Sequence, residues 1–344
     1  MEMKVLKDYV VNLKTIISKQ YPARFLSNQK KRFYEFIKNE LKDWEFEEWD
    51  SKNKKISFRN LLHSPHNLLK VNNIQTKGDQ FEILLLAHYD TVGVSFLTPF
   101  INGISKLIGF NGKYIVFSFS FLLFILSIIV GCFGLGTYFA LFLILFSLIA
   151  SIVYFKLPNP NNMNDNSSGV ITVLAIAKFL TVNNDKLISK IKIVFTDEEE
   201  RGCLGAKLLK NDLQLNNQLI LNFDGVGLGG SLYIQPLNWK EKYPLLQDHL
   251  KSYELVSRDL RASSDYDVFK NNNSIGFVFL EKSRWLGGYH ILNMHTAADT
   301  EIKEDHIAKF AYNIGEFVIK YLKRKKKKKF HFKRELRIKA TLKK

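Results

Sequence analysis

Residues of the types that bind metal ions stand where the apolar runs of this sequence end. The candidates are His88, Asp90, Asp165, Glu198, Glu199, Glu200, Asp224 and His295. The run LLLAHYD closes on the first two, and the glutamates follow a second run, KIKIVFT. In an open α/β sheet, ligands bind outside the carboxyl ends of the strands. Histidine together with several carboxylates suits zinc or a similar divalent ion, so the pattern predicts a metal site at that edge.

Each candidate also has an ordinary structural explanation. An aspartate after a strand, such as Asp224, is commonly a turn former, and Asp165 among asparagines and serines is typical of a helix cap. Three consecutive glutamates usually form a solvated edge, and a loop histidine such as His295 usually lies on the surface. The chemical interpretation therefore depends on the order in which these residues occur.

The motifs that contain the candidates occur in the order AHYD, NDNSSG, EERGCLGA, NFDGVG and HTAADT. This series resembles the zinc exopeptidases of metallopeptidase family twenty-eight, a group that includes di-zinc aminopeptidases, glutamate carboxypeptidase and glutaminyl cyclases. The resemblance covers about residues 20–322, apart from an apolar insertion. It implies an α/β fold in which a mixed, mostly parallel central sheet is flanked by helices.

The resemblance also implies a role for each metal ligand. His88 and Asp224 would hold one metal ion, and Asp165 would bridge it to a second. Glu200 and His295 would hold that second ion. The implied cofactor is a pair of divalent metal ions, with zinc as the expected metal.

Two catalytic roles follow from the same resemblance. Asp90 would orient the first histidine through a hydrogen bond and fix its tautomer. In the family, one residue separates a glutamate pair from a following glycine, here Gly202, so the pair is Glu199 and Glu200. Glu199 would then be the general base that takes a proton from the attacking water, and Glu198 has no assigned role.

The implied reaction is the removal of residues from the N-terminus of a peptide, so the expected partner is a peptide substrate with a free N-terminus. Two alternatives stay open. One is a glutaminyl cyclase-like acyltransferase, which in this group works with one zinc ion. The other is a catalytically inactive membrane scaffold. The segment SSDYDVF departs from the family pattern, since Tyr266 stands where histidine is usual, and this leaves the substrate pocket undefined.

The elements that must position these residues alternate between apolar strands and helices. Two helices are expected within residues 1–42, followed by strands around WEFEEWDS, KKISFRN, NLLKVNNIQ and FEILLLAHYD. Later strands are KIKIVFT, QLILNFDGVG, SLYIQ and SIGFVFLE, separated by helices. This alternation is typical of an α/β sandwich. Hydrophobic content of 46% argues against a largely disordered chain, and only two cysteines argue against a disulfide-stapled fold.

An apolar insertion separates AHYD from NDNSSG. Residues Tyr114–Phe155 contain no charged side chain, and the glycines of GCFGLG divide them near the middle. Each half, at about 18 to 20 residues, is long enough to cross a bilayer, which predicts a transmembrane helical hairpin at 113–156. Lys106, Lys113 and Lys156 flank it, so the positive-inside rule predicts a plasma-membrane protein with its catalytic domain on the cytoplasmic side.

The net charge of +17 is concentrated at one end of the chain. Residues 323–344 contain thirteen Lys or Arg and one acid, so most of the excess lies there. Such a tail is either a solvated end or a segment attracted to anionic membrane lipids. Nucleic acid is not an expected partner, because no recognisable nucleic-acid module accompanies the tail. The predicted organisation is a catalytic domain in two parts, 1–112 and 157–322, around the hairpin at 113–156, followed by the polybasic tail.

Overall fold

The sheet at the centre of the molecule is mixed, and its four middle strands run parallel. The computed structural model describes residues 1–48, 71–78, 80–93, 121–123, 125–131, 136–154, 158–258, 260, 264–282 and 288–341. The strands are β1 (Phe46–Glu48), β2 (Ile74–Thr76), β3 (Ile83–His88), β4 (Ile191–Thr196), β5 (Leu219–Phe223), β6 (Ser231–Gln235), β7 (Glu254–Leu255), β8 (Ser274–Lys282) and β9 (Tyr289–His290). Their order is β1-β2-β4-β3-β5-β8-β6-β7, and β9 pairs with β8. Strands β4, β3, β5 and β8 are parallel neighbours, while β2 and β6 join this group antiparallel.

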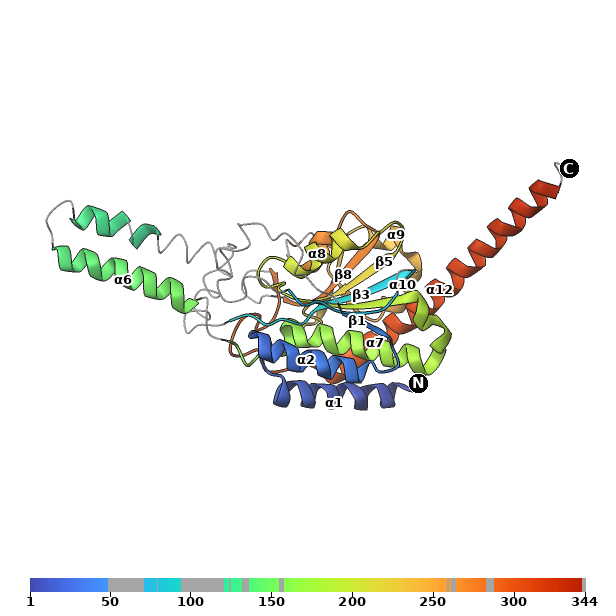
Figure 1. The fold of residues 1–344 in the computed structure, drawn as a ribbon, viewed down its shortest axis with the longest axis horizontal. Coiled ribbons are helices and arrows are strands. Elements are labelled where there is room, and N and C mark those ends of the chain that lie inside the picture. Colours follow the sequence, from blue (N-terminus) through green and yellow to red (C-terminus); the bar gives the residue numbers. More distant parts are fainter. Residues whose placement is uncertain are drawn as a thin grey trace.

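Helices cover both faces of this sheet (Figure 1). They are α1 (Met3–Gln20), α2 (Ser27–Glu40), α6 (Thr137–Tyr154), α7 (Ser168–Asn184), α8 (Leu204–Asp212), α9 (Trp239–Lys242), α10 (Pro244–Leu250), α11 (Asp265–Phe269) and α12 (Glu304–Thr341). On one face, α1, α7 and the first part of α12 pack against one another, with α2 beside them, and α8 lies on the opposite face. The sheet and its helices fit the α/β architecture expected from the sequence.

Strand β3 is buried on both faces because helices cover both. Leu85 and Ala87 pack into the larger core beneath α1, α7 and α12, whereas Leu84 and Leu86 pack on the side of α8 and α11. Successive side chains of a strand point to opposite faces, so a strand covered on both sides is apolar throughout rather than alternating. The unbroken apolar run before His88 is therefore a rigid mount for that histidine.

The chain leaves and re-enters this domain at one point. Gly93 and Pro158 form an antiparallel bridge, and the backbone N–H of Asn159 donates to the carbonyl of Val92 at 3.2 Å. Residues 94–157 are therefore inserted between two segments that touch each other, a few residues from both Asp90 and Asp165.

The transmembrane hairpin predicted at 113–156 is wrong. In the part of this insertion that the structure describes, residues 121–123, 125–131 and α6 are helical. None of the described helices is both long and apolar enough to cross a membrane. The other residues of 113–156 lie outside the described part of the chain. The plasma-membrane location and the cytoplasmic orientation were derived from this hairpin, and the described residues do not test them.

The polybasic end of the chain continues the last helix. Because α12 runs from Glu304 to Thr341, the residues expected to form a separate tail from 323 onward are helical over most of their length. The helix packs into the core as far as Leu322, and Figure 1 shows the remainder projecting from the body. Just beyond Leu322, Lys325 forms an ion pair with Glu82, the residue before β3.

Candidate metal centre

Three neighbouring parallel strands bring the candidate residues to one edge of the sheet. β3 ends at His88, β4 ends at Thr196 just before the glutamates, and β5 ends just before Asp224. β3 lies between the other two, and His88 stands opposite Thr196. Asp165 comes from the turn that precedes α7, and His295 from the loop between β9 and α12. The predicted edge of the sheet is therefore where these residues meet.

His88, Asp165 and Asp224 form a first group of potential metal ligands. One ligand atom from each lies within 4.8 Å of the others. The Nε2 atom of His88 is 3.3 Å from Oδ1 of Asp165 and 3.5 Å from Oδ1 of Asp224. The side chains of His88 and Asp165 are buried, whereas that of Asp224 is 15% exposed. The group thus combines an imidazole with two carboxylates at the floor of the site.

Asp165, Glu200 and His295 form a second group of the same kind. The Nε2 atom of His295 is 3.0 Å from Oδ2 of Asp165 and 3.0 Å from Oε2 of Glu200. The two oxygens of Asp165 therefore face different histidines. One carboxylate belongs to both groups, which is the arrangement a bridging ligand requires.

Unpartnered buried atoms indicate that these groups fit a divalent cation. Three buried atoms lack a hydrogen-bond partner: the two ring nitrogens of His88 and the Oε1 atom of Glu200. Burial by itself lowers the pKa of His88, but the surrounding carboxylates, Asp165 foremost, outweigh it and raise that pKa well above the ordinary value. Burial raises the pKa of Asp165, yet the histidines beside it hold the pKa below its usual range. Imidazole and carboxylate donors in an excess of negative charge are the donor set that zinc takes.

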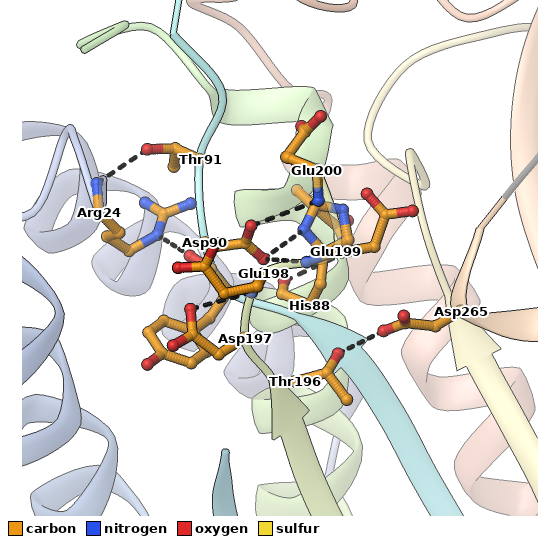
Figure 2. A network of polar contacts seen from close by, with 12 residues as sticks. Arg24, His88, Asp90, Thr91, Thr196, Asp197, Glu198, Glu199, Glu200 and Asp265 are labelled. Carbon is orange, nitrogen blue, oxygen red and sulfur yellow. Dashed lines mark hydrogen bonds and ion pairs between the residues drawn. The ribbon is translucent and has the colours of Figure 1, made fainter. Parts of the chain in front are cut away.

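Asp90 connects the first histidine to the glutamates. Its Oδ1 atom lies 3.4 Å from Nδ1 of His88, on the side of the ring away from the two carboxylates of the first group. The same carboxylate accepts hydrogen bonds from the backbone N–H of Glu199 at 3.1 Å and of Glu200 at 3.4 Å. Figure 2 shows Asp90 between the end of β3 and the turn that follows β4. Asp90 therefore holds two ligand-bearing segments in a fixed relation.

The three glutamates point in different directions. Glu198 turns away from both ligand groups: its carboxylate binds Nζ of Lys30 at 2.5 Å and the guanidinium of Arg201 at 2.7 Å. Lys30 also binds Asp197 at 2.5 Å, so a buried ion-pair cluster lies behind the turn. Glu198 has a φ of 59°, in the left-handed region that few side chains adopt. This backbone turn separates Glu198 from the two glutamates that follow.

Glu199 lies at the site but belongs to neither of the two groups that contain Asp165. Its Oε1 atom accepts a hydrogen bond from the thiol of Cys203 at 3.5 Å, and its carboxylate lies near that of Asp265. Burial raises the pKa of Glu199 well above its ordinary value; His88 opposes this rise, while Glu200 and other nearby carboxylates add to it. Glu199 is thus a buried carboxyl group beside the two ligand groups that belongs to neither of them. Asp265, which the sequence did not single out, binds the hydroxyl of Thr196 with one oxygen and is otherwise unpartnered (Figure 2).

Asparagines on both sides of Asp165 tie its turn to the loop after β5. The Oδ1 atom of Asn164 accepts hydrogen bonds from the backbone of Gly227 and Leu228, each at 3.0 Å. Asn166 donates to the carbonyl of Phe223 at 2.9 Å, directly before Asp224. The motif NDNSSG therefore fixes the Asp165 carboxylate relative to Asp224.

Asp299 holds the same turn from the side of His295. Its two carboxylate oxygens accept the backbone N–H groups of Asn164 at 2.7 Å and of Asp165 at 3.0 Å. Burial raises the pKa of Asp299 to about 7, and these two hydrogen bonds oppose the rise. Asp299 is the aspartate of the motif HTAADT, so this motif supplies both the potential ligand His295 and the residue that positions Asp165.

Part of the chain matches a known family of peptidases. The matched family is peptidase family M28. The match covers residues 153–318. This range contains the candidates Asp165, Glu199, Glu200, Asp224 and His295. The segment of His88 precedes the matched range, and the fold brings it back to the others through β3.

Several solved structures have a similar fold. A Zn-dependent exopeptidase from Parabacteroides distasonis is 14% identical, with a TM-score of 0.59 over 92% of this chain and 97% of that one. The glutaminyl cyclase of Tannerella forsythia is 14% identical, with a TM-score of 0.60 over 92% and 98%. A leucine aminopeptidase precursor from Bacteroides thetaiotaomicron is also 14% identical, with a TM-score of 0.57 over 92% and 96%. At these identities the likeness shows the fold.

Among curated proteins, a vacuolar membrane protease from Vanderwaltozyma polyspora is 23% identical over 145 residues, which is 39% of this chain. This chain spans only 15% of the length of that relative. The match to peptidase family M28 agrees with the enzyme class predicted from the sequence, a zinc-dependent metallopeptidase, and the solved structures show the fold. The class implies a peptide substrate and a divalent metal cofactor.

Proposed function

We propose that this chain is an exopeptidase of the aminopeptidase type that holds two zinc ions. The observation that carries the proposal is the shared carboxylate: Asp165 offers one oxygen to the group of His88 and the other to the group of His295. Two complete sets of donors that meet at one residue suit a pair of ions better than a single ion. Asp224 completes the first set and Glu200 the second.

Residues around the ions take the remaining roles. When bound, the zinc pair lowers the pKa of a water molecule and polarises the carbonyl of the peptide bond. Glu199 accepts the proton of that water on its carboxylate and passes it to the leaving amine, which requires a glutamate at the site that is not itself a ligand. Asp90 lies 3.4 Å from Nδ1 of His88, where its carboxylate would orient the ring and leave Nε2 to bind metal. The substrate of this proposal is a peptide with a free N-terminus.

The test combines metal analysis with peptide hydrolysis. The purified full chain should contain two equivalents of zinc, lose activity when a chelator removes them, and regain it when zinc is added. Peptides with free N-termini should be shortened from that end, whereas the same peptides with acetylated N-termini should stay intact. A chain that binds no zinc, or cleaves both kinds of peptide inside their sequences, contradicts the proposal.

A second candidate function is glutaminyl cyclisation. The likeness to solved glutaminyl cyclases favours it, since their TM-scores of 0.58 and 0.60 are close to the 0.59 of the Zn-dependent exopeptidase. The two complete ligand groups argue against it, because the cyclases of this group work with one zinc ion. A peptide that begins with glutamine distinguishes the two reactions by mass. Cyclisation lowers the mass by that of ammonia, whereas aminopeptidase cleavage releases free glutamine.

A further inference from the structure

Arg24 lies fully buried behind the metal centre, in the loop between α1 and α2. Its Nε atom donates to the carbonyl of Tyr89 at 2.5 Å, and one terminal nitrogen donates to the hydroxyl of Ser167 at 2.9 Å. The other terminal nitrogen donates to the carbonyl of Tyr21 at 3.0 Å. Figure 2 shows Arg24 beside the end of β3, with its backbone paired to Thr91. All three arms of the guanidinium are therefore used.

Two of these acceptors belong to segments that carry potential ligands. Tyr89 stands between His88 and Asp90, and Ser167 lies two residues after Asp165. One planar side chain thus joins the end of β3 to the turn before α7. A guanidinium suits this task because its donors point in fixed, divergent directions, whereas a lysine presents a single charged point.

The charge of Arg24 is compensated by the acids of the site. Burial lowers the pKa of Arg24 to about 10, while the negative charges of Asp90, Asp299 and Asp165 raise it. The side chain therefore stays protonated at neutral pH. A buried cation that loses its anionic partners strongly destabilises the fold, and buried carboxylates that lose their cation destabilise it in the same way. Arg24 also lies over the ring of Phe33, 4.9 Å from its centroid, which fixes the guanidinium plane.

We propose that Arg24 is a positioning residue of the metal centre, which sets the separation between His88 and Asp165 before metal binds. This inference rests on the proposed metal centre and adds a residue that touches neither ligand atom. Two substitutions distinguish the contribution of the positive charge from that of the hydrogen bonds. Arg24→Lys keeps the charge but loses the divergent hydrogen bonds, and Arg24→Gln loses the charge and most of the bonds.

The experiment measures zinc affinity by competition with a chromogenic chelator in the wild-type chain and both variants. Residues that orient metal ligands typically change metal affinity by about 10- to 100-fold. Arg24→Gln should weaken the binding of one zinc ion by that factor. The zinc affinity of Arg24→Lys should lie between those of Arg24→Gln and the wild type. At saturating zinc, kcat for a short peptide should fall while KM changes little, because Arg24 does not reach the substrate.

Matched variants separate positioning from simple loss of stability. Leu13→Ala removes a buried apolar side chain of α1; it should lower the thermal midpoint and leave zinc affinity unchanged. Ser167→Ala removes one acceptor of Arg24 with little loss of volume and should weaken zinc binding several-fold. Zinc affinities equal to the wild type in Arg24→Gln, or in Ser167→Ala where Arg24→Gln does not fold, would overturn the inference. A wild-type chain without zinc would instead overturn the proposed function.

Discussion

The glutamates after β4 differ in what surrounds each carboxylate, and this difference makes a prediction about single residues. Glu199→Gln should retain both zinc ions, because this side chain belongs to neither group that shares Asp165, yet lower kcat by about 10²–10⁴-fold through loss of the general base. Glu200→Gln should instead bind one zinc ion less tightly. Metal content by atomic absorption and steady-state kinetics on one peptide check both results.

Glu198→Gln is the control for this assignment. Its partners are Lys30 and Arg201, so the substitution should lower stability while kcat stays near that of the wild type. If Glu198→Gln abolishes turnover and Glu199→Gln does not, the base has been placed one residue too late.

At the residue level, sequence alone identifies the candidate ligands that the structure brings together, but few of the residues that position them. His88, Asp165 and their partners are predictable because their types and order match a known series of motifs. Arg24 and Asp299 are not, because their importance lies in backbone and hydroxyl contacts with segments that are distant along the chain. The direction of the Glu198 side chain also depends on a left-handed backbone conformation, which the residue types around it do not predict.

At the element level, the start of α7 approaches β5 so closely that only glycine fits. A Cβ atom on Gly169 would overlap the side chain of Asn166 and the carbonyl of Phe223. Gly169→Ala should therefore push the Asp165 turn away from β5, cost about 1–3 kcal/mol of stability and weaken zinc binding. Gly131→Ala is the matched control, since its Cβ would meet no atom within 4 Å and its φ is not positive. Equal zinc affinity in the two variants would show that the turn tolerates the displacement.

The element predictions succeed where periodicity and burial agree. The runs FEILLLAHYD, KIKIVFT and QLILNFDGVG are strands because helices cover both faces of the sheet there. The short elements β7, β9 and α11 were not predicted, since two to five residues carry no periodic signal. KKISFRN lies outside the described residues. The hairpin prediction was wrong because none of the described helices is both long and apolar enough to cross a membrane. A run without charged residues does not by itself determine how long the helices within it are.

At the scale of the whole molecule, α12 changes from a core helix to a projecting one, and we propose that the domain ends close to this change. Leu322 is buried and Lys325 pairs with Glu82, whereas Lys326 is exposed. Removal of residues 327–344 should leave zinc binding and hydrolysis of short peptides unchanged, and stability within about 0.5 kcal/mol. Truncation from Ile319 should cost roughly 3 kcal/mol or more, because it also removes buried side chains. Chemical denaturation of both truncated chains measures the difference.

The bridge between Gly93 and Pro158 has a consequence for how this sequence can be rearranged. Because the two segments already touch, the domain needs only a connection between them. The free energy of closing that connection grows with the logarithm of its length. In the limit of a flexible loop, an eight-residue Gly/Ser linker in place of residues 94–157 changes the closure free energy by about 2 kcal/mol, in the stabilising direction. We expect the shortened chain to fold, bind two zinc ions and hydrolyse short peptides, as calorimetry and kinetics can establish. Failure to bind zinc would mean that the inserted residues contribute to the site. Success would make this junction a place where unrelated segments can be grafted within a few residues of Asp90 and Asp165.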